Sequence, residues 1–279
     1  MPDAPDDALV PLRIAVAGKG GSGKSVLSGT MARLIARRGG RVLALDSDLL
    51  PGLSMSLGSG PDPVEAPLWG ATQKKPDGRG YMWGEGMHAA LAAQRFALDA
   101  PDGVRLLLRG KQGPGGFRAV IGASQTFWEV VHGLVDAPEF RDWTLIGDLP
   151  AGQYQVADDW APYARIYLVV VQPTMQSALT GRRILRVARM RAPEARYLVI
   201  ANRVRDEDDV RHVEKLVGEP PFASLPFDED VAAAERLGRA PIDHAPESKS
   251  VAAIDGLIDS LVALERERQA AAPAAAVQS

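Results

Sequence analysis

Hydrophobic and polar positions alternate along the chain in two patterns, which predict strands and helices in turn. Short continuous apolar runs are typical of strands that are buried on both faces of a sheet. These runs lie at 12–17, 41–45, 104–108, 143–146, 166–171, 196–201 and 222–225. Apolar residues at helical spacing lie at 24–38, 124–135, 177–190, 208–216, 228–237 and 248–268.

The order of these elements predicts the fold class. The first three predicted elements are a strand at 12–17, a helix at 24–38 and a strand at 41–45. This order is typical of a βαβ unit, in which the two strands are parallel. Connections of this kind are right-handed in nearly all proteins. Because the alternation continues almost to the end of the chain, we expect an α/β fold with a doubly wound, mostly parallel sheet flanked by helices.

The chain is expected to form a single domain over 12–268. A disordered lead is predicted at 1–11 and a flexible tail at 269–279, where proline and alanine are frequent. The stretch 58–86 is rich in glycine, proline and lysine, and it is predicted to be a loop insertion. Long loops are usually functional, so this stretch is a hypothesis for a partner-contact surface. Its aromatic residues include Trp69, Tyr81 and Trp83.

Composition narrows the possible functions. The chain has 279 residues, no cysteine and a net charge of −3. Without cysteine, thiolate zinc sites, iron–sulfur clusters, disulfides and cysteine nucleophiles are excluded. The acidic balance argues against a general nucleic-acid binder, although it permits a local basic patch. No apolar stretch approaches the roughly 20 residues that span a bilayer, so we expect a cytoplasmic protein without a membrane partner.

The strongest chemical signal is a glycine-rich segment between the first strand and the first helix. It fits the phosphate-loop pattern GxxxxGK[ST] in the expected strand-to-helix context. Consecutive backbone N–H groups and the helix N-terminus favour bound phosphate, while Lys24 reaches the terminal phosphates and the Ser25 hydroxyl binds Mg²⁺. The pattern therefore predicts ATP and Mg²⁺ as ligands. The predicted nucleotide contacts here are Gly18, Gly20, Gly21, Ser22, Gly23, Lys24, Ser25 and Val26.

A second lysine in this loop, Lys19, resembles the deviant Walker A signature KGGxGK[ST] of the ParA/MinD superfamily of P-loop ATPases. The resemblance implies a homodimer in the ATP state, in which Lys19 reaches the phosphates of the partner's nucleotide. It also implies catalytic roles for Lys19 and Lys24. Only 7 lysines occur in the chain, so the presence of two in one loop points to a function for both.

The same resemblance assigns roles to carboxylates at two strand ends. In Asp46-Ser47-Asp48, Asp46 supports the Mg²⁺ shell and Asp48 positions the attacking water. Asp148, at the end of the 143–146 strand, resembles the Walker B aspartate that holds Mg²⁺ through water. Gly152 resembles the switch II glycine whose amide senses the γ-phosphate. The predicted metal set is therefore Ser25, Asp46 and Asp148.

Adenine is the favoured base. A guanine-specific protein usually offers Asn-Lys-x-Asp, whereas this chain has Asn202-Arg203-Val204-Arg205 after a predicted strand. Asn202 could pair with the N6/N7 edge of adenine, and Arg203 could stack on the ring. Pro226 lies in a segment that resembles the family's loop over the base.

Within the superfamily, the pattern is most similar to the nickel-insertion ATPases that mature carbon monoxide dehydrogenase. This similarity is carried by the phosphate loop and by segments 148–152, 170–177 and 228–231. That branch has a Cys-x-Cys metal site, but the corresponding residues at about 113–119 contain no cysteine, so nickel binding of that kind is excluded. We expect a slow, partner-stimulated ATPase switch that acts as a maturation, assembly or positioning factor for an unidentified protein client.

Three other functions would each require a different feature of the sequence. A DNA-partition ATPase would need a basic surface, and one predicted helix carries Arg182, Arg183, Arg186, Arg189 and Arg191. Such a run is more often a solvated helix face, so nucleic acid is possible but not favoured. A membrane-positioning ATPase would need a basic amphipathic C-terminal helix, whereas 248–268 carries a core-facing stripe. A small-molecule kinase or ligase would have no need of Lys19.

Overall fold

The computed structural model describes residues 9–49, 52–61, 63, 66–110 and 116–276. Most of the predicted lead, the last three residues of the predicted tail and part of the segment compared with the Cys-x-Cys site lie outside these ranges. The division into lead, domain and tail stays a prediction.

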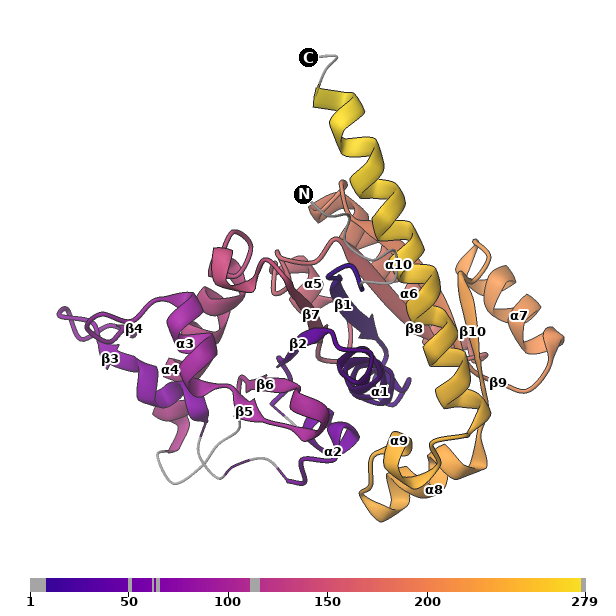
Figure 1. Cartoon of the computed structure of the whole chain (residues 1–279), viewed down its shortest axis with the longest axis horizontal. Helices are drawn as coiled ribbons and strands as arrows, with labels where there is room; N and C mark the ends of the chain where they lie inside the picture. The colour runs from indigo at the N-terminus through magenta and orange to yellow at the C-terminus, as the bar shows by residue number, and fades with distance from the viewer. Residues whose placement is uncertain (1–8, 50–51, 62, 64–65, 111–115, 277–279) are drawn as a thin grey trace.

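A central sheet organises the described part of the chain (Figure 1). Its strand order is β10-β9-β8-β1-β7-β2-β6-β5, and neighbouring strands are parallel except that β5 runs antiparallel to β6. This confirms the doubly wound α/β fold. The strands are β1 (Arg13–Gly18), β2 (Arg41–Asp46), β5 (Leu98–Asp99), β6 (Arg105–Leu108), β7 (Trp143–Asp148), β8 (Ile166–Val171), β9 (Arg196–Val204) and β10 (Ala223–Pro226).

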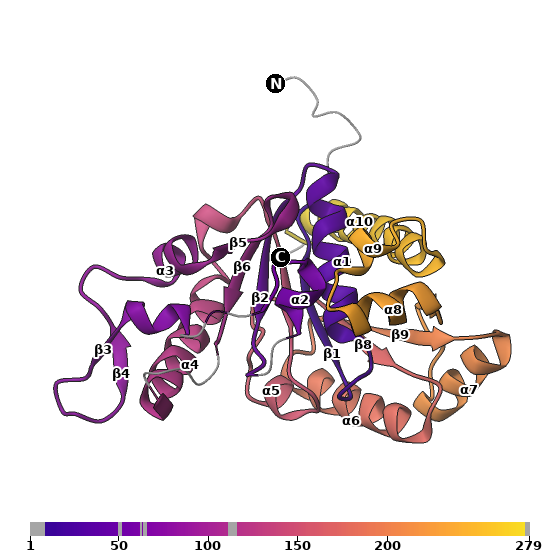
Figure 2. The same cartoon turned by 90° about the horizontal axis from the view of Figure 1, so that it is seen from below.

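Two helical layers cover the sheet (Figure 2). The alternation of side chains along β1 shows why both faces are covered. Ile14 and Val16 pack in one core with α1 and α10, whereas Ala15 and Ala17 pack in the other with α4, α6 and α7. The helices are α1 (Lys24–Arg37), α2 (Leu53–Leu57), α3 (Ala89–Phe96), α4 (Gly116–Gly133), α5 (Tyr154–Ala157), α6 (Met175–Arg191), α7 (Glu207–Val217), α8 (Glu229–Leu237), α9 (Pro241–His244) and α10 (Lys249–Ala276).

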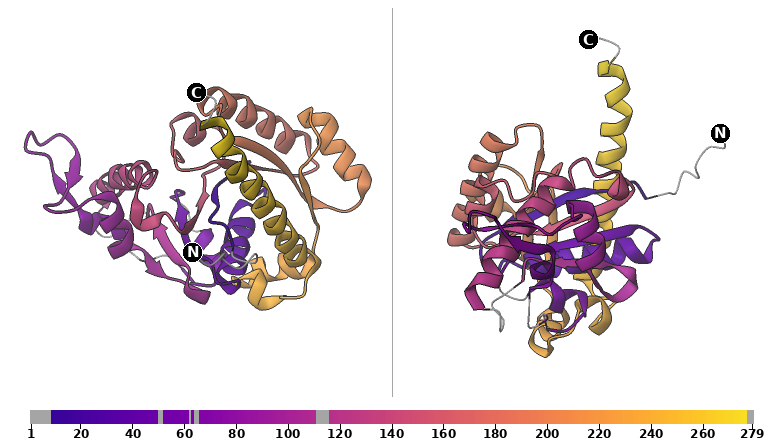
Figure 3. Two further views of the ribbon diagram at one scale, coloured as in Figure 1. Left: turned by 45° about the horizontal axis from the view of Figure 1, so that its top comes forward. Right: turned by 90° about the vertical axis from the view of Figure 1, so that its left-hand side faces the viewer.

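The predicted loop insertion contains regular structure, which corrects that interpretation. A 3₁₀ turn, η1 (Pro67–Ala71), leads into an antiparallel hairpin of β3 (Thr72–Lys74) and β4 (Tyr81–Trp83). The hairpin extends to one side of the molecule (Figures 1 and 3). A two-stranded hairpin needs packing to be stable, and here Trp69 and Tyr81 meet edge to face, with ring centroids 5.2 Å apart, above Gly122 of α4. These two aromatic side chains thus pack inward.

Several boundaries also differ from the predictions. Helix α4 begins at Gly116, before the predicted start at 124, and α10 continues to Ala276, past the predicted end at 268. The short elements α2, α3, α5, α9 and β5 were not predicted. Within the described residues, no helix has both the length and the apolar character that crossing a bilayer requires.

Candidate nucleotide-binding site

The phosphate loop turns tightly between β1 and α1. Gly21 and Gly23 adopt φ values of 74° and 96°, in the left-handed region that side chains with a Cβ disfavour. The N–H of Ser22 donates to the Lys19 carbonyl over 3.1 Å. Gly23 is also the residue before α1, so the loop leads directly into the positive end of a helix. This conformation suits bound phosphate.

The two lysines of the loop differ in their surroundings. Lys24 is only 8 % exposed, and its Nζ donates to the Lys19 carbonyl over 3.4 Å, which folds the ammonium over the loop. Lys19 is half-buried, and no described residue forms an ion pair or hydrogen bond with its ammonium. Lys24 therefore lies over the loop, where its predicted contact with phosphate would be made, while the Lys19 ammonium contacts no polar group of the described residues.

Polar groups from neighbouring strand ends hold the loop. Gln172 Nε2 donates to the Gly21 carbonyl over 3.0 Å, and Asn202 Nδ2 donates to the Ser22 carbonyl over 2.7 Å. The Oδ1 of Asn202 accepts from the backbone N–H of Arg203 over 2.9 Å. The structure thus gives Asn202 a loop-holding contact that the sequence did not predict; its expected contact with adenine stays a prediction.

Gly152 contacts the same loop. Its N–H donates to the Gly18 carbonyl over 3.1 Å, and its φ is 96°. The predicted contact between this N–H and a γ-phosphate would therefore replace an existing hydrogen bond. Such an exchange is the kind of change that couples a nucleotide state to loop position.

The predicted carboxylates lie together at the carboxyl ends of β2 and β7. Asp46 and Asp148 are opposite each other in the strand register, and each is 2 % exposed. Asp46 accepts from the N–H of Asp48 over 3.0 Å and from the N–H of Leu53 over 3.3 Å. These bonds fix the backbone of the segment that follows β2 and contains Asp48.

Asp148 is the most perturbed carboxyl in this site. Burial raises its pKa to about 6, the nearby charge of Asp48 adds to the rise, and a hydrogen bond with Ser25 and the charge of Lys24 oppose it. Its Oδ1 is buried without a hydrogen-bond partner among the described residues. A buried carboxylate oxygen without a partner is costly unless a cation or donor completes it.

The donor set fits Mg²⁺. Ser25 lies close enough to Asp148 to act on the pKa of its carboxyl, and both side chains offer oxygen ligands next to the phosphate loop. Mg²⁺ commonly takes one or two protein oxygens, with the other positions filled by water and phosphate. Among the described residues, no group of three acidic or histidine side chains is placed to hold a metal ion by itself, and a nucleotide-bound Mg²⁺ does not require one. Ser22 Oγ, a second buried atom without a described partner, lies in the loop where phosphate would bind.

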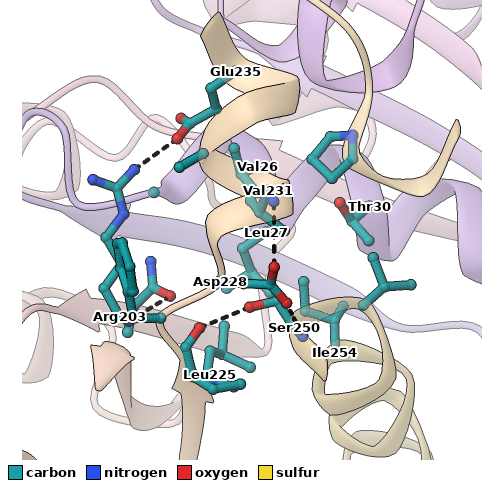
Figure 4. Close-up of a pocket in the computed structure, with 17 residues that line it drawn as sticks. Val26, Leu27, Thr30, Arg203, Leu225, Asp228, Val231, Glu235, Ser250 and Ile254 are labelled. Carbon is teal, nitrogen blue, oxygen red and sulfur yellow. Dashed lines mark hydrogen bonds and ion pairs between the residues drawn. The ribbon is translucent and has the colours of Figure 1, made fainter. Parts of the chain in front are cut away.

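A cleft continues from the loop toward α8 and α10 (Figure 4). Its two adjoining pockets share five lining residues, Gly23, Val26, Arg203, Glu235 and Pro241. The inner part is mainly apolar and includes Leu27, Leu225, Pro226, Val231 and Ile254. An apolar slot next to a phosphate loop is suited to a planar base. The positions of Val26, Asn202, Arg203 and Pro226 agree with their predicted roles in base binding, which stay predictions.

An ion pair borders this cleft. Arg203 Nη2 and Glu235 Oε2 are 2.8 Å apart, which joins the end of β9 to α8 (Figure 4). Arg203 has a φ of 60°, an uncommon value for a residue with a long side chain. Stacking of Arg203 on a base would require its guanidinium to adjust this pairing. Glu235 was not identified from the sequence because one acidic residue on an exposed helix carries no motif.

Arg109 is a second residue that sequence reasoning missed. Its backbone N–H donates to the Asp46 carbonyl over 2.8 Å, and its Nη1 donates to the Ser47 carbonyl over 3.3 Å. On the other side, Nε donates to Ser124 Oγ over 2.9 Å and the guanidinium lies 4.5 Å from the ring centroid of Trp160. Burial lowers the pKa of Arg109, and the charge of Asp48 opposes this. Arg109 thus joins the Asp46–Asp48 segment to α4.

Comparison with known families identifies the class. The family of CobQ/CobB/MinD/ParA nucleotide-binding domains matches residues 14–242, and the chain belongs to this family. The predicted ParA/MinD resemblance is therefore confirmed, and the protein is a ParA/MinD-type member of the P-loop ATPases.

Individual relatives agree with this class. An uncharacterized ATP-binding protein of Methanocaldococcus jannaschii is 26 % identical over 264 residues, which cover 91 % of this chain and 99 % of that protein. The carbon monoxide dehydrogenase accessory protein CooC of Rhodospirillum rubrum is 25 % identical over 244 residues, covering 84 % and 91 %. The septum site-determining protein MinD of Pyrococcus horikoshii, solved with Mg-ADP, has the same fold, with a TM-score of 0.62, 22 % identity and coverage of 89 % and 94 %.

Proposed function

We propose that the protein is an ATP-dependent dimeric switch. ATP with Mg²⁺ binds at the phosphate loop, two subunits close face to face, and Lys19 of each subunit reaches the phosphates held by the other. Slow hydrolysis then resets the dimer. The switch serves the maturation or assembly of a protein partner.

One observation carries this proposal, namely the different placement of the two loop lysines. Lys24 is buried over its own loop, whereas the Lys19 ammonium bonds to no described residue. A cation at the head of a phosphate loop that does not serve its own subunit is suited to act across an interface. There it would stabilise charge on the transferring phosphoryl group, as an arginine finger does.

The other site residues supply the remaining chemistry. Ser25 and Asp148, with Asp46 behind them, would hold Mg²⁺, which neutralises charge on the phosphates when it is bound. Asp48 is less buried than Asp46 and would orient the attacking water. Its negative charge is balanced in part by Arg109, which lies within electrostatic range.

The biological role is inferred from one relative. The similarity to CooC favours a maturation factor, and the partner remains unidentified. Because the chain has no cysteine, any metal handling by the partner would proceed without thiolate ligands on this chain.

A DNA-partition role is the second candidate because α6 presents a basic face. Arg182, Arg183 and Arg186 are exposed, and no described carboxylate pairs with them, whereas Arg189 pairs with Glu219 at 2.7 Å. ATP-dependent DNA binding that falls steeply with salt would favour this role. Absence of binding at low salt would exclude it.

The dimer proposal is tested with two lysine variants. Lys19→Ala is expected to bind ATP with the affinity of the parent protein but to remain monomeric with Mg-ATP. Lys24→Ala is expected to lose both properties, with ATP affinity lowered about tenfold or more, equivalent to about 1.4 kcal/mol. Light scattering after gel filtration measures the mass, and calorimetry measures the affinity.

Lys215→Ala, which changes an exposed lysine on α7, serves as the matched control and should behave as the parent protein does. A Lys19→Ala protein that still forms a dimer with Mg-ATP would contradict the proposal.

A further inference from the structure

A second groove lies beside α4 and shares no lining residue with the nucleotide cleft. We call it the α4 groove. Helix α4 forms one wall, and the hairpin of β3 and β4 approaches from the side (Figure 1). The lining residues are Lys75, Tyr81, Ser124, Gln125, Trp128, Glu129 and Trp160.

The exposed aromatic surface of this region belongs to α4. Trp128 is 40 % exposed, and Ile121 on the same helix is 38 % exposed. By contrast, Tyr81 of the hairpin is 9 % exposed. The indole of Trp128 packs against His132, with ring centroids 3.9 Å apart and ring planes tilted by 36°, and its Nε1 donates to the Asp158 carbonyl over 3.5 Å. A large, exposed indole with such contacts is typical of an interaction site.

The groove contains one carboxylate that a cation could bind. Glu129 is half-buried beside Trp128, and no described residue forms an ion pair or hydrogen bond with it. Burial raises the pKa of Glu129, and the positive charge of Lys75 opposes this without reaching ion-pair distance. Asp158 and Asp159, on the loop that contacts Trp128 and His132, are exposed and add negative potential.

An arginine side chain would match this surface. A guanidinium is planar, so it can stack on an indole and present its N–H groups to a carboxylate at the same time. The apolar side chain of Ile121, almost two turns before Trp128 on α4, would accommodate a neighbouring apolar residue of the same segment. A lysine ammonium would pair with Glu129 but would stack less well.

We propose that the α4 groove binds an arginine side chain of the partner protein, with the guanidinium stacked on Trp128 and paired with Glu129. This rests on the proposed function only in that a protein partner exists. Arg109 connects the groove to the nucleotide site, because it donates hydrogen bonds to Ser124 Oγ in the groove wall and to the carbonyl of Ser47, which lies between Asp46 and Asp48.

The test uses N-acetylarginine amide as the probe and the uncharged analogue N-acetylcitrulline amide as the matched control. Protein with ¹⁵N-labelled tryptophan is titrated without nucleotide, and the five indole N–H signals are followed by NMR. The Trp128→Phe variant assigns the Trp128 signal. The Trp128 signal is expected to shift and saturate with the arginine probe, and to shift less than one fifth as far with citrulline.

Side-chain variants then test the charges. Glu129→Gln should weaken probe binding at least fivefold, whereas Lys75→Met, which removes the competing cation, should strengthen it at least twofold. Glu139→Gln, at an exposed position, is the control and should leave binding unchanged. Equal shifts with citrulline, or unchanged binding in Glu129→Gln, would overturn the proposal.

The same experiment separates the possible occupants. Self-association of the nucleotide-free protein that the arginine probe reverses would assign the groove to a second copy of the chain and would overturn the assignment to a partner protein. Because nucleotide is absent, failure of the probe to bind would leave the switch model intact. Conversely, if the parent protein did not dimerise with ATP, the switch model would fail, while binding of the probe to the α4 groove would still be expected.

Discussion

At the scale of single residues, Asp148 is expected to lower the stability of the nucleotide-free protein while providing a ligand for Mg²⁺. The carboxyl is buried at the end of β7, and burial raises its pKa to about 6. Its ionised form at neutral pH therefore disfavours the nucleotide-free fold. An acid whose pKa is raised on folding contributes stability only while it is protonated, and this contribution is lost as the pH rises from about 4 through about 6.

In EDTA at pH 7.5, Asp148→Asn should accordingly raise the free energy of unfolding by about 2 kcal/mol. The difference should shrink as the pH falls toward 4, where the carboxyl of the parent protein is neutral too. The variant should also lose the stabilisation that Mg-ATP gives the parent. Urea denaturation across this pH range measures both effects, and an Asn variant less stable than the parent at pH 7.5 in EDTA would contradict this account.

At this scale the sequence names candidate residues where the chemistry is local. The phosphate loop, Asp46 and Asp148 could be proposed because glycines, lysine, serine and strand-end carboxylates follow one another in fixed order, and their roles stay predictions. Gln172, Arg109 and the loop-holding role of Asn202 depend on strand ends that are distant in sequence. Their single polar side chains carry no pattern until the sheet order brings them beside the loop.

At the scale of elements, one carboxylate joins two helices behind the base cleft. Asp228 precedes α8, and its Oδ1 accepts from the N–H groups of Asp230 at 3.0 Å and Val231 at 3.4 Å. Its Oδ2 accepts from the N–H of Ser250, in the first turn of α10, at 3.2 Å (Figure 4). Burial acts to raise the pKa of Asp228, but these backbone donors outweigh it and lower the pKa below its usual value.

Asp228→Ala should therefore lower the free energy of unfolding by about 1–2 kcal/mol. It should also weaken nucleotide binding, because α8 and α10 both line the cleft. A depressed carboxyl pKa contributes stability above its unfolded value near 3.8, and that contribution disappears as the pH falls through the folded value. Urea unfolding at pH 7 checks the effect, with Asp230→Ala as an exposed control; equal stability of both variants would contradict the capping role.

Helices and strands could be predicted where their burial is reflected in a regular pattern of apolar residues. Central parallel strands such as β8 are apolar throughout, so their positions could be predicted closely. The short helices α2 and α9 have too few residues to show helical periodicity. The hairpin of β3 and β4 exists because Trp69 and Tyr81 pack on Gly122 of α4, a contact that no local pattern reveals.

At the scale of the whole molecule, the sheet separates two surfaces. The nucleotide cleft lies at the carboxyl ends of the central strands, near α8 and α10, and the α4 groove lies toward the hairpin side (Figures 1 and 2). The Asp46–Asp48 segment lies between them and is bonded to Arg109. This arrangement would allow a partner on one side to influence the switch on the other.

The central claim is that Lys19 acts across a dimer, and subunit mixing tests it most directly. Lys19→Ala and Asp48→Ala proteins should each hydrolyse ATP slowly or not at all. In a mixed dimer, the site of the Lys19→Ala subunit keeps its own Asp48 and receives Lys19 from the other subunit, so one site is complete. Mixing the two proteins before ATP is added should therefore restore a substantial fraction of the parent rate of phosphate release. A rate no greater than the sum of the separate variants would contradict the account.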